Sequence, residues 1–137
     1  MAIVLDTSVV IALMRARDAE HARVREWMAT LDDDLVTTPL AVAEMDQLAA
    51  ALGEAFSDGL WQDLDSGAYA VRWWADAMGE TIAIARRQPQ IGLVDASLVA
   101  LAARLRTDRI ATLDREHFGS LTTSDGEPLV LLPADPT

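Results

Sequence analysis

The chain has 137 residues, 51% of them hydrophobic, and a mean hydropathy of +0.16, which fit one compact domain and exclude a disordered chain. Its formal net charge is −11, from 22 acidic residues and 11 basic ones, and every basic residue is an arginine. This charge excludes nucleic-acid binding by nonspecific phosphate attraction alone, which needs a basic footprint. It suits a basic protein partner, or a substrate whose contact is local and mediated by metal.

Composition also limits the setting of the chain. With no cysteine, disulfides and zinc–thiolate sites are excluded, and we expect a cytoplasmic location. No apolar run approaches the ~20 residues of a membrane-spanning helix. The start, residues 1–6, lacks the basic segment of a signal peptide and reads as a core strand. We find no repeat or linker and expect a single domain over residues 1–137, without membrane contact.

The first half of the chain alternates short strands with helices. We expect strands at 2–5 and 35–38, and helices at 9–14, from residue 18 or 19 onward, at 39–52 and at 54–64. The hydroxyls of Thr7 and Ser8 are placed to cap the first helix or to orient the Asp6 carboxylate. Pro39 fits the first turn of the third helix, which stops at Gly53. The acidic run 32–34 is interpreted as a solvated turn.

The second half continues the alternation. We expect strands at 68–71, 109–112 and 129–132, helices at 75–87 and 94–105, and a loop at 89–92. Strands alternating with helices predict a mostly parallel central sheet that helices cover on both faces, which is a three-layer α/β/α sandwich.

Four acidic residues stand where a strand ends or a helix begins. Asp6 closes the first strand and Asp114 follows the strand at 109–112, while Glu44 and Asp95 lie near the starts of apolar helices. Singly, each has a plain alternative as a turn, a helix cap or a solvent-facing helix residue. Together, at the carboxyl ends of parallel strands, they would repel one another unless a cation lay between them. The arrangement predicts a divalent-metal site, and phosphodiester chemistry as its use.

The segment around Asp114 adds candidates. Glu116 supplies a possible fifth carboxylate, and Arg115 and His117 are within reach of a phosphate. We interpret His117 as a loop or packing residue, however, and His21 as a helix-surface residue.

The motifs, in this order and spacing, resemble those of PIN-domain nucleases, and within them the VapC-like toxins of toxin–antitoxin pairs. They are Ile3-Val4-Leu5-Asp6-Thr7-Ser8, Pro39-Leu40-Ala41-Val42-Ala43-Glu44, Leu93-Val94-Asp95-Ala96-Ser97-Leu98, Ile110-Ala111-Thr112-Leu113-Asp114-Arg115-Glu116-His117-Phe118 and Leu129-Val130-Leu131-Leu132-Pro133. The resemblance covers nearly the whole chain and implies a PIN-like sandwich and a divalent-metal-dependent endoribonuclease, the toxin of a type II pair.

The resemblance also implies a set of site residues and partners. Asp6, Glu44, Asp95 and Asp114 become a quartet that binds Mg²⁺ or Mn²⁺, with Thr7, Thr112 and Glu116 in support. Asp6 and Asp95 are our first choice as direct ligands, since Mg²⁺ keeps several waters and needs few carboxylates. The implied partners are RNA, a basic antitoxin and a second copy of the chain, as a homodimer or as a heterotetramer and larger with antitoxin.

The roles of two groups of residues, and two alternative functions, stay open. RNA contact would rest on arginines near the site, among them Arg15, Arg86, Arg87 or Arg115. The tryptophans Trp61, Trp73 and Trp74 are more typical of a core or a dimer interface, with base stacking as the alternative. Phosphoacceptor domains and haloacid-dehalogenase-type phosphatases use a lysine, which this chain lacks. An RNA-processing nuclease without an antitoxin, or a non-catalytic module on the same fold, remains an alternative.

Overall fold

The computed structural model describes residues 1–123 and 126–134. Within them, one five-stranded sheet has the order β3-β2-β1-β4-β5, and all its strand pairings are parallel. The strands are β1 (Ala2–Leu5), β2 (Asp34–Thr37), β3 (Ala70–Val71), β4 (Arg109–Ala111) and β5 (Val130–Leu132). The prediction of a mostly parallel sheet is confirmed.

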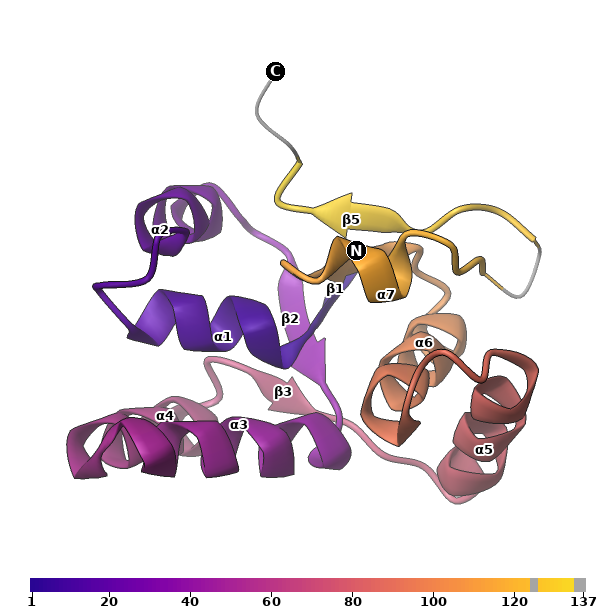
Figure 1. Ribbon diagram of the computed structural model, residues 1–137, viewed down its shortest axis with the longest axis horizontal. Coiled ribbons are helices and arrows are strands. Elements are labelled where there is room, and N and C mark those ends of the chain that lie inside the picture. The colour runs from indigo at the N-terminus through magenta and orange to yellow at the C-terminus, as the bar shows by residue number, and fades with distance from the viewer. Residues whose placement is uncertain (124–125, 135–137) are drawn as a thin grey trace.

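Helices cover both faces of this sheet. They are α1 (Thr7–Met14), α2 (His21–Ala29), α3 (Pro39–Leu52), α4 (Glu54–Ser66), α5 (Ala77–Arg87), α6 (Leu93–Leu105) and α7 (Arg115–Phe118). Figure 1 shows α1 and α2 on one side of the strands and α5 and α6 on the other. The predicted three-layer α/β/α sandwich is therefore confirmed.

The central strand β1 lies at the middle of the core. Ile3, Val4 and Leu5 are fully buried, as expected for a parallel strand with helices on both faces. Val4 pairs with Val36 of β2 on one side and with Ile110 of β4 on the other. Strands β2 and β3 therefore extend the sheet from one side of β1, and β4 and β5 extend it from the other. This arrangement creates a switch point between β1 and β4, where open α/β sheets bind their ligands.

The ends of several elements differ from the predictions. Helix α1 begins at Thr7, so the expected cap at Thr7 or Ser8 is wrong: Asp6 occupies the N-cap position, without a capping hydrogen bond from its side chain. Strand β2 stops at Thr37 because Thr38 caps α3, its hydroxyl accepting the Ala41 N–H at 3.2 Å. The pattern of apolar residues does not show whether a threonine at this position continues the strand or caps the next helix, because that depends on its hydrogen bonds.

The acidic run 32–34 and the helix α7 also depart from expectation. Asp33 is not simply solvated, because its Oδ2 lies 3.0 Å from a guanidinium nitrogen of Arg109. Helix α7 was not predicted, since four residues are too few to show a helical period.

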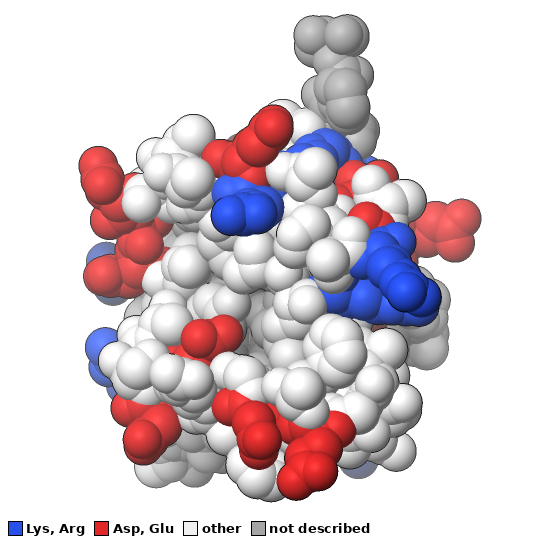
Figure 2. Space-filling view, turned by 90° about the vertical axis from the view of Figure 1, so that its left-hand side faces the viewer, with Lys and Arg blue, Asp and Glu red and all other residues white. Residues whose placement is uncertain are grey.

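Charged side chains are scattered over the surface. Figure 2 shows the left-hand side of Figure 1, where acidic patches and separate arginine patches alternate with wide uncharged areas. The arginines drawn there do not merge into a band that could track a phosphate backbone. In the part of the chain that the structure describes, we also find no helix with the length and apolarity needed to cross a membrane.

Two glycines, one at the end of α7 and one inside α4, allow a test of helix packing by stability measurements. A Cβ on Gly119 would meet the Arg115 carbonyl oxygen at 2.5 Å, whereas at Gly59, inside α4, nothing lies within 4 Å. We expect Gly119→Ala to lower the free energy of unfolding by about 1–3 kcal/mol through overpacking. Gly59→Ala should raise it by about 0.5–1 kcal/mol, because alanine costs less entropy in a helix. Urea unfolding measures both, and equal effects would contradict the packing of α7.

Candidate active site

The four predicted acidic residues line one cleft, which we call the acid cleft. Its volume is about 390 Å³, and its lining residues are Asp6, Thr7, Ser8, Ile11, Asp18, Glu44, Leu48, Asp95, Leu113, Asp114 and His117. Asp6 comes directly after β1, and Asp114 comes shortly after the end of β4. These are the two strands that flank the switch point. The acid cleft therefore lies at the edge of the sheet where the sequence placed it.

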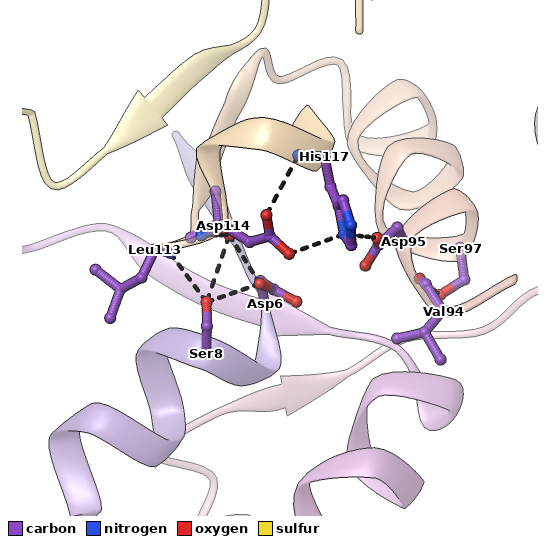
Figure 3. A network of polar contacts seen from close by, with 9 residues as sticks. Asp6, Ser8, Val94, Asp95, Ser97, Leu113, Asp114 and His117 are labelled. Carbon is purple, nitrogen blue, oxygen red and sulfur yellow. Dashed lines mark hydrogen bonds and ion pairs between the residues drawn. The ribbon is translucent and has the colours of Figure 1, made fainter. Parts of the chain in front are cut away.

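Asp6 is held in one orientation by two hydroxyl groups. Its Oδ2 accepts hydrogen bonds from Ser8 Oγ at 2.8 Å and from Thr112 Oγ1 at 2.7 Å, and the residue is only 5% exposed. Figure 3 shows Ser8 and Asp6 turned towards each other beneath the segment at Leu113. With Oδ2 satisfied, Oδ1 is the oxygen of Asp6 that remains for a ligand.

Ser8 takes the second of its two expected roles, because its hydroxyl orients the Asp6 carboxylate. Besides Asp6, its hydroxyl contacts the far segment, accepting the Leu113 N–H at 2.9 Å. Thr7, the predicted supporting residue, lines the acid cleft, but its hydroxyl lies 3.4 Å from the Ala41 carbonyl oxygen and contacts no carboxylate among the described residues. A serine two positions after an aspartate at a helix start is the signal that points to such a contact.

Asp95 lies in the first turn of α6, with 17% of its side chain exposed. Burial, and after it the negative charges of Asp6, Asp114 and Glu44, raise the pKa of this carboxyl to about 6, while His117 acts in the opposite direction. The positive end of the helix does not offset these effects. A carboxyl in this setting is one that gains from a nearby cation.

His117 lies between two of the carboxylates. Its Nδ1 is 2.8 Å from Asp114 Oδ2 and 3.1 Å from Asp95 Oδ2, as Figure 3 shows. Its backbone N–H also donates to Asp114 Oδ1 at 3.2 Å. The interpretation of His117 as a loop or packing residue is therefore wrong: α7 carries its ring into the acid cleft, and the imidazole is the cationic or donor group that joins these two carboxylates.

Other candidates lie outside the acid cleft. Glu116 is exposed and does not line it. Arg115 donates a hydrogen bond to the Pro133 carbonyl oxygen, and Arg87 lines a different groove. Thr112 is fully buried behind the cleft and acts on it through Asp6.

The donor set fits a hard divalent cation. The acid cleft offers carboxylate oxygens and no thiolate, which is the preference of Mg²⁺ and Mn²⁺. As they stand, no three acidic or histidine side chains among the described residues converge closely enough to chelate one ion. Burial and the neighbouring carboxylates raise the pKa of Asp95, so its charged form would gain from a cation held in the acid cleft.

Fold and cleft together define an α/β sandwich protein with carboxylates at the switch point of a parallel sheet. The family profile of the PIN domain matches residues 3–121, and the chain belongs to this family. It is 33% identical to "Ribonuclease VapC26" of Mycobacterium tuberculosis over 139 residues, which cover 95% of this chain and 99% of that protein. The resemblance noted in the sequence is confirmed.

Solved structures share the fold. VapC20 of Mycobacterium tuberculosis, described as a sarcin-ricin loop cleaving toxin, has a TM-score of 0.72 at 21% identity, over 79% of this chain and 86% of that one. A toxin–antitoxin complex from Klebsiella pneumoniae has a TM-score of 0.69 at 15% identity, over 87% of this chain and 92% of that one.

The raised pKa of Asp95 predicts a pH-dependent stability. Between the ordinary value of 3.8 and about 6, the folded chain binds more protons than the unfolded chain, so the free energy of unfolding falls as pH rises through this window. In EDTA at pH 7.5, Asp95→Asn should therefore stabilise the chain by about 1–3 kcal/mol, at 1.36 kcal/mol per pKa unit. Thermal unfolding of both proteins from pH 4 to 8 measures this, and parallel curves would contradict it.

Proposed function

We propose that this chain is a divalent-metal-dependent endoribonuclease and the toxin of a type II toxin–antitoxin pair. The observation that carries the proposal is the convergence of Asp6, Glu44, Asp95 and Asp114 on one cleft at the switch point of the sheet. Likeness to a ribonuclease along 95% of the chain supports the reaction class. The lining of a single cleft by all four carboxylates favours an enzyme over a non-catalytic module of the same fold.

We assign different roles to the residues of the acid cleft. Asp6 Oδ1 and the Asp95 carboxylate would hold the cation, and Glu44 and Asp114 would complete the site directly or through water. Bound Mg²⁺ or Mn²⁺ supplies an activated water and screens charge on the scissile phosphate. The chain's own part is orientation: Ser8 and Thr112 fix Asp6, while His117 positions Asp114.

The partners follow from charge and family. A net charge of −11 suits a basic antitoxin, and a relative of the same fold is described as a toxin–antitoxin complex. We propose a single-domain cytoplasmic protein that forms a homodimer, and a heterotetramer or larger assembly with its antitoxin. Tight binding of this basic antitoxin should block RNA cleavage.

Metal removal and loss of a ligand test the reaction. We expect RNA cleavage with Mg²⁺ or Mn²⁺ and none in EDTA, with activity restored by added metal. Asp6→Asn should reduce kcat by at least about 10²-fold, since it removes a charge that the cation needs while preserving side-chain size. The assay is cleavage of single-stranded RNA by the purified chain. Cleavage that survives both EDTA and Asp6→Asn would sink the metal mechanism.

The hydroxyl contact of Ser8 gives a finer test. Ser8→Ala removes one of the two donors to Asp6 Oδ2, so metal affinity or activity should fall by about 10–100-fold. Ser8→Thr keeps the hydroxyl and should restore most of it. Ser66→Ala, which removes an exposed hydroxyl bonded only to its own helix, serves as the control. Mn²⁺ binding by Ser8→Ala at the level of the control would show that Ser8 has no positioning role.

A further inference from the structure

A second groove lies between α5 and α6, beside the segment at 121–123, and we call it the arginine groove. Its volume is about 740 Å³, larger than the acid cleft, and Arg87, Arg104 and Arg106 line it. Figure 1 shows α5 and α6 side by side, away from α1 and α2. No step of the proposed reaction uses this groove.

The charged residues that line the arginine groove are mostly basic, whereas the chain as a whole is acidic. It holds three of the chain's eleven arginines, against one acidic lining residue, Glu80. Glu80 already accepts the Trp74 Nε1–H at 2.9 Å. Among the residues that the structure describes, none of the three arginines forms an ion pair. In a protein with twice as many acids as bases, such a set of cations points to an anionic ligand.

Arg106 stands where glycine is the usual residue. Its φ of 55° and ψ of 43° place it in the left-handed region at the end of α6, and it is the one non-glycine residue with positive φ in the described part of the chain. The comparable end of α4 has Gly67. The left-handed conformation costs a residue with a side chain about 1–2 kcal/mol relative to glycine. The chain therefore carries the Arg106 guanidinium at a position where glycine would be more favourable for the backbone.

Aromatic rings adjoin the arginines. The Arg104 guanidinium lies 5.7 Å from the centre of the Trp74 ring, and Trp73 is 5.8 Å from Trp74 and 38% exposed. Cationic side chains beside an exposed aromatic ring are the chemistry that holds single-stranded nucleic acid, through phosphate contact and base stacking. An acidic peptide would use the arginines but not the rings.

Helix α6 connects the arginine groove to the acid cleft. Asp95 lies in its first turn, Val99 already lines the groove, and Arg104 follows nearer the other end. At 1.5 Å per residue, Val99 and Arg104 are about 6 and 14 Å from Asp95 along the axis. We propose that the arginine groove binds the phosphate backbone of the RNA strand a few nucleotides from the scissile bond. This inference rests on the proposed endoribonuclease function.

The test compares two double variants that lose the same charge. Arg87→Gln with Arg106→Gln removes cations of the groove, and glutamine keeps the Cβ, so the backbone cost at 106 is unchanged. Arg17→Gln with Arg25→Gln is the matched control, because both arginines are exposed and neither lines the arginine groove or the acid cleft. All proteins carry Asp95→Asn to prevent cleavage. Fluorescence anisotropy then measures the affinity for fluorescein-labelled single-stranded RNA over a series of salt concentrations.

We expect the groove variant to lose about tenfold or more in affinity at low salt, and its salt slope to fall by about 1.4, for two lost phosphate contacts. The control should keep the parent values. Equal losses in both variants would overturn the groove, while RNA cleavage by the chain with an intact cleft would still uphold the nuclease. A chain that neither binds nor cleaves RNA overturns both proposals. Unchanged RNA affinity with lost binding of a labelled oligo-glutamate peptide would identify a protein site and overturn the RNA proposal.

Discussion

The structure depends on one electrostatic constraint, the gathering of like charges at the switch point of a parallel sheet. Because β1 and β4 run side by side in the same direction, the residues that follow them emerge together, and Asp6 meets Asp114 and Asp95 there. Burial and, after it, the charges of the neighbouring carboxylates raise the pKa of Asp95. A fold that keeps such a costly cluster has a use for a cation at that place.

Polar contacts between distant segments keep the cluster in position. Thr112 and Ser8 link β4, α1 and Asp6, and the buried hydroxyls of Thr38 and Ser97, 2.8 Å apart, join the starts of α3 and α6. These contacts place the carboxylates on rigid helix ends rather than on loops. Rigid placement is what a metal-assisted reaction requires from its protein, since orientation supplies much of the rate.

The sequence predicts the sandwich and the four acidic residues because both follow from local pattern: apolar strands alternate with helices, and acids occur at strand ends. It does not predict the contacts that Ser8 and Thr112 make between distant segments, or His117 as a site residue. The contacts of Thr112 with Asp6 and of Ser8 with Leu113 span 106 and 105 positions, and the ring of His117 reaches Asp95 across 22. Helix α7, which carries His117, is too short to show a period. Only the folded chain brings these groups together.

Calorimetric titration of the chain with Mn²⁺ at pH 6, in two buffers that differ in ionisation enthalpy, shows whether the acid cleft is a cation site. If the clustered carboxylates form a cation site, Mn²⁺ binds and displaces protons from Asp95, so the apparent enthalpy differs between the buffers. Asp95→Asn should weaken binding and remove that difference. The absence of binding, or binding that Asp95→Asn leaves unchanged, would contradict the account.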